Sequence, residues 1–198
     1  MYARIVQSTA ATDIDGGVAF VRDTVVPIIR QQHGYRGLVV SADRAARVFG
    51  VLSLWTDKAD LEASTSALAK TRDEGQKIIG GELTVEGFEE ILFEAKQPPG
   101  PGTALLVRHV SMDSAKVDDN IEFFRSTILP QIQATPGFRG VRQMVNRETG
   151  SSVVGTLWDD AAAMEKAAAE AEARQAQAAG RVTFGEQTKR EILFVDVP

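Results

Sequence analysis

The chain has 198 residues, of which 43% are hydrophobic and 25% are charged, a composition that is ordinary for a globular protein. Its 22 basic and 27 acidic residues give a net charge of −5, which excludes the strongly basic surface of a nucleic-acid-binding protein. The absence of cysteine excludes disulfides, thiolate metal sites and a cysteine nucleophile. The first residues form no apolar leader and no apolar run approaches 18 residues, so we expect a cytoplasmic protein without a membrane partner.

An internal repeat organises the chain. When the sequence is shifted by 103 residues, residues 20–38 align with residues 123–141, and eight of the 19 pairs are identical. The same shift places Trp55 on Trp158. Because self-similarity at a fixed period is the signature of repeated structural units, we interpret the chain as a tandem duplication.

The two repeats are separated by a short segment rich in proline and glycine, residues 97–102. Such a composition resists both helix and sheet and behaves as a stiff spacer. The sequence therefore predicts one module over residues 1–96 and a second over residues 103–198.

Each repeat reads in chain order as strand, helix, strand, strand, helix, strand. The elements expected in the first repeat are strand 2–7, helix 15–32, strands 35–40 and 48–55, a helix capped by Asp57, and strand 87–95. Those expected in the second are strand 105–111, a matching first helix, strands 138–145 and 152–158, an alanine-rich helix 161–179 capped by Asp159 or Asp160, and strand 190–197.

A proline lies inside the first helix of each repeat, at Pro27 and at Pro130. Proline removes a backbone donor and costs about 3 kcal/mol in a helix interior, so the matched positions predict a tolerated kink near the helix end. Gly34 and Gly137 follow as helix stops, because glycine adopts the left-handed conformation at low cost.

A βαββαβ unit of this length forms a ferredoxin-like fold, with two helices on one face of a four-stranded antiparallel sheet. The other face of each sheet would remain apolar and uncovered. The sequence therefore predicts an α+β protein of two tandem ferredoxin-like modules, packed sheet to sheet as a pseudo-dimeric α/β barrel.

Three features of each repeat resemble one known family. These are the proline within the first helix, the turn HGYRG or PGFRG, and a strand that ends in Leu-Trp before an acidic helix cap. Together they resemble the antibiotic biosynthesis monooxygenase (ABM)-like family, over nearly the whole chain. The resemblance implies a single-chain version of a dimeric α/β barrel. Some members of that family are cofactor-independent oxygenases of aromatic or quinol-like substrates, and others degrade haem.

Five side chains are candidates for a binding or catalytic site. The resemblance implies that Trp55 and Trp158 border the pocket, although they can equally be core aromatics. His109 is the candidate general base, because an imidazole that points into an apolar barrel titrates near neutral pH; a hydrogen-bonded core histidine is the alternative. Arg4 and Arg108, which we place at matching positions of the first strands, could bind a ligand anion or form ordinary salt bridges.

The sequence contains no motif for a metal site, a serine hydrolase, a dinucleotide-binding site or a haem ligand. No cluster of histidine and cysteine predicts a zinc or iron site, and neither a GxSxG nor a GxGxxG motif stands in the right context. Neither repeat has a histidine on its second helix, where haem-degrading relatives carry their iron ligand. We therefore expect no metal and no cofactor.

Two functions follow as hypotheses. The first is a cofactor-independent monooxygenase or related enzyme that acts on an aromatic or polyketide-like compound in a barrel pocket, with His109 as base and with Arg108 and the tryptophans shaping the site. The alternative is a non-catalytic binding or structural module. The expected partner is a small hydrophobic or aromatic molecule, and the chain is expected to be a monomeric pseudo-dimer or a homodimer.

Overall fold

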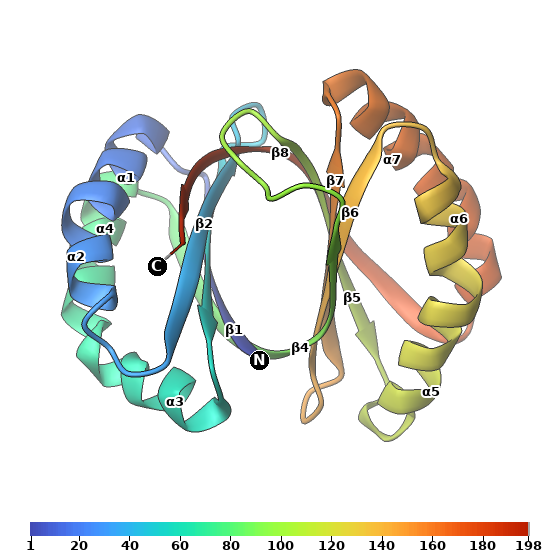
Figure 1. The fold of residues 1–198 in the computed structure, drawn as a ribbon, viewed down its shortest axis with the longest axis horizontal. Coiled ribbons are helices and arrows are strands. Elements are labelled where there is room, and N and C mark those ends of the chain that lie inside the picture. Colours follow the sequence, from blue (N-terminus) through green and yellow to red (C-terminus); the bar gives the residue numbers. More distant parts are fainter. Residues whose placement is uncertain (198) are drawn as a thin grey trace. The chain divides into compact units, whose positions relative to one another are not determined.

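The computed structural model describes residues 1–197, and its elements follow the predicted order in both repeats (Figure 1). The first repeat contains β1 (Tyr2–Thr9), α1 (Ile14–Phe20), a π-helical turn (Val21–Val25), α2 (Val26–Ile29), β2 (Tyr35–Asp43), β3 (Val48–Trp55), α3 (Lys58–Ala67), α4 (Ala69–Ile79) and β4 (Glu82–Ala95). The second contains β5 (Ala104–Met112), a 3-10 turn (Ser114–Lys116), α5 (Val117–Phe123), a π-helical turn (Phe124–Ile128), α6 (Leu129–Ala134), β6 (Phe138–Asn146), β7 (Ser151–Trp158), α7 (Ala161–Gln175), a 3-10 turn (Ala176–Ala178) and β8 (Val182–Asp196).

Hydrogen bonds join the strands in the order β1-β3-β2-β8-β5-β7-β6-β4, which closes into a barrel. Within each repeat the first strand pairs antiparallel with the third, and the third with the second. The predicted α+β fold, with two ferredoxin-like modules in one eight-stranded antiparallel barrel, is confirmed.

The chain divides into two compact units. Unit 1 includes the end of β8 from the second repeat, and unit 2 includes the end of β4 from the first repeat. Among the described residues, unit 1 comprises 1–89, 100–102 and 190–197, and unit 2 comprises 90–99 and 103–189. In Figure 1 the helices of each unit lie along one face of that unit's strands. The domain boundary at residues 97–102 remains a prediction. Each compact unit contains residues from both repeats, so the units do not coincide with the repeats.

The last strand of each repeat is longer than expected. β4 begins at Glu82 and β8 at Val182, whereas the sequence predicted strands from residues 87 and 190. The added residues include Leu83 and Val85 in β4 and Val182 and Phe184 in β8, which alternate with polar residues or glycine over only four or five positions. Pairing with neighbouring strands, such as that of Thr84 with Gln7 of β1, keeps these residues extended.

The predicted kinks take the form of π-helical turns that end just before each proline. The N–H of Val26 donates to the carbonyl of Val21, and the N–H of Leu129 donates to that of Phe124, which are i to i−5 bonds. A wider turn accommodates a proline ring that would otherwise clash with the preceding turn of an α-helix. The same solution in both repeats shows that the proline and the π turn form one structural feature.

The helix boundaries follow the expected capping residues. Asp57 accepts a hydrogen bond from the N–H of Asp60 at 2.9 Å, and Asp160 accepts one from the N–H of Ala163 at 2.8 Å. After the first helix of each repeat, Gly34 and Gly137 have φ of 73° and 86°, the left-handed conformation that ends a helix. Among residues 1–197, the structure has no helix that is long and apolar enough to cross a membrane.

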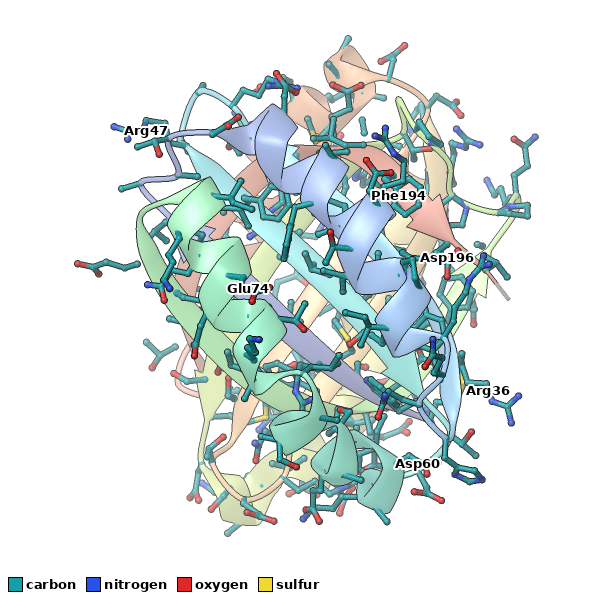
Figure 2. All side chains as sticks on the ribbon, turned by 90° about the vertical axis from the view of Figure 1, so that its left-hand side faces the viewer. Arg36, Arg47, Asp60, Glu74, Phe194 and Asp196 are labelled. Carbon is teal, nitrogen blue, oxygen red and sulfur yellow. The ribbon has the colours of Figure 1, made fainter. Side chains whose placement is uncertain are left out.

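A buried carboxylate fixes the end of β8 in unit 1. Asp196 is 5% exposed and accepts hydrogen bonds from the Arg30 guanidinium at 2.5 and 3.1 Å and from the Tyr35 hydroxyl at 2.8 Å. Figure 2 shows Asp196 on β8 beside the α2 end of the first helix. The hydrogen bonds from Arg30, and to a smaller extent the one from Tyr35, lower the pKa of Asp196 against the opposing effect of burial. Burial, the hydrogen bond and the carboxylate charge together raise the pKa of Tyr35.

Replacing this carboxylate should destabilise the protein in a pH-dependent way. Because the folded pKa of Asp196 lies below its unfolded value of about 3.9, its contribution is complete above that pH and is lost as pH falls through the folded pKa. At pH 7, Asp196→Asn should lower the free energy of unfolding by about 2 kcal/mol, as expected for charge-assisted hydrogen bonds. Urea unfolding at pH 7 and pH 3 measures this, and the difference from wild type should shrink at pH 3. Asp23→Asn, which breaks an exposed ion pair, is the control; equal effects of the two variants would contradict the prediction.

Candidate active site

Unit 2 contains a cavity of about 130 Å³ between its sheet and its helices. Alternate residues of β5 and β7 point into it, because successive side chains of a strand face opposite sides of the sheet. The helices contribute Phe124 and Ile128 from the π turn and alanines from α7. The walls are therefore mainly apolar. The residues that line it include Leu106, Arg108, Asn120, Gln143, Ala171 and Trp158.

Trp158 forms one wall of this cavity and is held in a fixed orientation. Its side chain is 1% exposed, its indole N–H donates to Oγ1 of Thr156 at 2.9 Å, and its ring packs edge-on against Phe138 with 5.8 Å between centroids. Trp55 has the same arrangement in unit 1, with Ser53 as the acceptor and Tyr35 as the aromatic neighbour. Both interpretations of the tryptophans thus apply to Trp158, which is at once a core residue and a cavity wall.

Arg108 provides positive charge at the cavity. Its guanidinium donates to the carbonyl of Gly185 at 3.3 Å and to the side chain of Gln187, and it lies 5.8 Å from the centre of the Phe184 ring. Burial lowers the pKa of Arg108, against the opposing charge of Glu172, but the group stays cationic at neutral pH. A guanidinium has five N–H donors, so hydrogen-bonding capacity remains for an oxygen atom of a ligand.

Two buried amides that sequence reasoning did not single out also line the cavity. Gln143 is 3% exposed and Asn120 is 6% exposed. Oε1 of Gln143 and Oδ1 of Asn120 have no hydrogen-bond partner among the described residues. The available signal was a polar residue at a position where the other repeat has an apolar or small one, Val40 for Gln143 and Gly17 for Asn120.

The corresponding cavity of unit 1 is smaller, about 70 Å³, and contains Arg4. The Arg4 guanidinium donates to Oγ of Ser64 at 2.5 Å, to Oγ1 of Thr65 at 2.6 Å and to the carbonyl of Leu61 at 2.7 Å. Burial, together with the nearby charge of Arg72, lowers the pKa of Arg4 to about 10. The side chain is thus committed to the protein's own helix α3, which fits the structural role considered for it in the sequence.

The strand registers correct one prediction, namely that Arg4 and Arg108 occupy matching positions. Arg4 pairs with Ser53, whereas in unit 2 the residue opposite the matching Thr156 is Leu106. The counterpart of Arg108 is Val6. The first strands are related by a shift of 102 rather than 103, because the loop that follows the first strand is one residue longer in the second repeat.

Four polar residues around the unit 2 cavity have apolar or small counterparts in unit 1. Across the sheet of unit 2, Val154 pairs with Arg108 on one side and with Gln143 on the other. The same row in unit 1 consists of three valines, Val6, Val51 and Val40. Further counterpart pairs are Asn120 with Gly17 and Ser152 with Phe49.

Gly17 and Phe49 fill this end of unit 1. A Cβ on Gly17 would lie 3.2 Å from the Phe49 ring and 2.8 Å from Ile79, so glycine is needed for the ring to pack there. The fold therefore closes this space with apolar groups in one unit and leaves it open and polar in the other.

The structure brings Arg108 and Trp158 together and places the other predicted site residues elsewhere. His109 is half-buried on the opposite face of β5 from Arg108, where it pairs with Val153, and it is not among the residues that line the cavity. Trp55 and Arg4 belong to unit 1. Within residues 1–197, no group of three or more histidine, aspartate or glutamate side chains could hold a metal ion.

Comparison with known proteins identifies the fold. No family model matches the chain. A curated relative, an uncharacterized protein of Mycobacterium tuberculosis, is 29% identical over 167 residues, which cover 84% of this chain and 75% of the relative. A second uncharacterized protein of that organism is 26% identical over 133 residues, 67% of this chain and 56% of its own.

Solved structures match nearly the whole chain. A candidate monooxygenase from Fusobacterium nucleatum has a TM-score of 0.72 at 12% identity, covering 99% of this chain and 94% of its own. An anthrone oxidase-like protein has a TM-score of 0.70 at 15% identity, with 99% and 92% covered. This chain shares their fold. The resemblance to the ABM-like dimeric α/β-barrel proteins is thereby confirmed for the fold, in a single chain that contains both repeats.

Removing the acceptor of the Trp158 indole should destabilise the protein. Thr156→Val leaves a buried N–H without a partner and should lower the free energy of unfolding by about 1–3 kcal/mol, measured by urea unfolding. Ser53→Ala removes the equivalent acceptor of Trp55 and should cost a similar amount. Ser126→Ala, at an exposed helix position, is the control and should leave stability unchanged. A Thr156→Val protein as stable as wild type would show that this hydrogen bond does not hold the indole.

Proposed function

We propose that the chain binds one small, flat, aromatic molecule in the cavity of unit 2 and acts on it as a cofactor-independent monooxygenase or a related enzyme. One observation carries the proposal. Two repeats with the same fold differ at this cavity, which is smaller in unit 1, where Arg4 is hydrogen-bonded to helix α3, and larger in unit 2, where two buried amide oxygens have no partner among the described residues. Since unit 1 shows that the fold does not require those polar groups, their presence in unit 2 favours a ligand-binding role.

The cavity volume limits the size of the ligand. At about 130 Å³ it is below the roughly 300–1,000 Å³ of pockets that enclose drug-sized molecules. Apolar cavities of about 150 Å³ accommodate a benzene ring. The ligand, or the part of it that enters unit 2, is therefore about the size of one aromatic ring.

The chemistry of the lining residues suits an anionic aromatic substrate. An ionised phenol or enol is electron-rich and can react with molecular oxygen without a cofactor, provided that the protein holds the anion in a dry cavity. Arg108 would stabilise the oxyanion by a charge-assisted hydrogen bond, and Trp158 would pack against the ring. The solved structures of a candidate monooxygenase and of an anthrone oxidase-like protein are consistent with this reaction class.

A non-catalytic binding protein is the alternative, and one feature of the cavity favours it. The residues that line the cavity include no histidine, aspartate or glutamate, so none of them is a conventional general base. An enzyme would need a substrate that arrives ionised, or would need His109 to act from the other face of β5. The cytoplasmic location and the monomeric or homodimeric state remain predictions.

Filling each cavity in turn tests where the ligand binds. Ala171 of α7 and Leu68 at the start of α4 are equivalent lining residues. We expect Ala171→Phe to abolish oxygen uptake with hydroquinone-type and anthrone-type substrates, and to abolish their binding, because the new ring occupies the unit 2 cavity. Leu68→Phe in unit 1 is the matched control and should retain both. Oxygen-electrode assays and calorimetric titrations measure the two readouts. Loss of binding only in Leu68→Phe would overturn the proposal, and binding without oxygen uptake would favour the non-catalytic alternative.

The His109→Ala variant distinguishes a substrate that binds already ionised from one that His109 deprotonates. If the substrate binds already ionised, the variant should keep wild-type oxygen uptake at pH 8, where a phenol of low pKa is largely deprotonated. If His109 supplies the base, uptake should fall at least tenfold with substrate affinity unchanged. Uptake measured from pH 6 to pH 9 distinguishes these outcomes, and Arg108→Met, which should lose substrate affinity at every pH, is the comparison.

A further inference from the structure

Two buried amide side chains line the unit 2 cavity, and the oxygen of each has no hydrogen-bond partner among the described residues. Oε1 of Gln143 lies on β6 and Oδ1 of Asn120 on α5, and both side chains are more than nine-tenths buried. The orientation of Asn120 is set by the hydrogen bond from its Nδ2 to the carbonyl of Lys116 at 2.9 Å. The buried atom of this amide without a partner is Oδ1, a hydrogen-bond acceptor.

Leaving such acceptors unpaired is destabilising, since a buried polar group without a partner loses its hydration and gains nothing in return. The fold does not need these two amides, because unit 1 has Val40 and Gly17 at the equivalent positions. Gln7, another buried glutamine, shows the usual solution, since its Oε1 accepts a hydrogen bond from Arg190 at 2.5 Å. The two acceptors of unit 2 are thus suited to a partner that is not part of the chain.

Gln143 and Arg108 lie on opposite sides of Val154 at the wall of the cavity. Both residues flank Val154 in one row across the sheet, so their Cα atoms are two strand spacings apart, about 10 Å. Arg108 carries hydrogen-bond donors and Gln143 an acceptor, and between them lies the apolar surface of Val154. A ring that rests on Val154 can reach both side chains from its edges.

From this arrangement we propose that Gln143 and Asn120 form a donor-binding subsite that determines ligand specificity. The subsite takes a hydroxyl or N–H group on the edge of a small flat ring, opposite an acceptor oxygen that binds Arg108. A ligand that lacks the donor, or that has an ether oxygen in place of the hydroxyl, leaves two buried acceptors unpaired and binds less tightly. This inference rests on the proposed small-molecule site of unit 2 and adds the chemistry of its ligand.

Binding of three simple probes tests the subsite. Phenol has the donor, anisole has the same oxygen as an ether, and toluene has neither. We use the Trp55→Phe protein, in which Trp158 is the remaining tryptophan, and follow its fluorescence during titration. Phenol should bind at least tenfold more tightly than anisole or toluene. In Gln143→Met and in Asn120→Leu this preference should fall to less than threefold, while toluene binds as well as before.

The stability of the ligand-free protein provides an independent test. Gln143→Met replaces an unpaired polar group with an apolar one of similar size, so the melting temperature should rise by about 2–4 °C. Gln7→Met, which removes a partnered amide, is the matched control and should lower the melting temperature. A structural role for Gln143 predicts a fall in both variants.

The outcomes separate failure of the subsite from failure of the proposed function. If phenol and toluene bind equally well, or if Gln143→Met keeps the phenol preference or lowers the melting temperature, the subsite is wrong although the cavity still binds ligands. If none of the three probes changes Trp158 fluorescence or releases heat in calorimetry, the small-molecule site itself is wrong, and the subsite with it.

Discussion

The buried tryptophan that ends the third strand of each repeat sets the register on which the rest of the structure depends. Trp55 pairs with Tyr2 on one side and Tyr35 on the other, and Trp158 pairs with Ala104 and Phe138. Because side chains alternate along a strand, one fixed pairing decides which residues of three strands face the helices. The indole hydrogen bond and the edge-on aromatic contact hold that reference point in both units.

With this register in common, the two units pack the space between sheet and helices with different side chains. In unit 1 the space between sheet and helices is reduced by Phe49 and by Arg4, whose guanidinium is bonded to α3. In unit 2 the counterparts of those residues are Ser152 and Leu106, and α7 presents alanines, so space remains. Because the two units share one fold, unit 1 shows that the fold forms without the polar residues found at the unit 2 cavity.

The polar groups of unit 2 are costly for folding. A cation whose pKa is lowered by burial and two amide oxygens without protein partners each oppose stability, by an amount of about 1–3 kcal/mol per unpaired group. Natural proteins tolerate such departures from local consistency mainly at functional sites. The well-packed core of unit 1, which includes Trp55 and Leu38, helps to offset that cost within the same chain.

The sequence by itself determined the duplication, the order of elements, the capping aspartates, the helix-ending glycines and the α+β fold, because these depend on periodicity and on local backbone preferences. It also identified Arg108 and Trp158 as site candidates. Only the tertiary structure decided that Arg4 is the counterpart of Leu106, that His109 lies outside the cavity, and that Gln143 faces it. These facts depend on strand register and on a one-residue difference in loop length, and a shift of one residue reverses the face of every side chain in a strand.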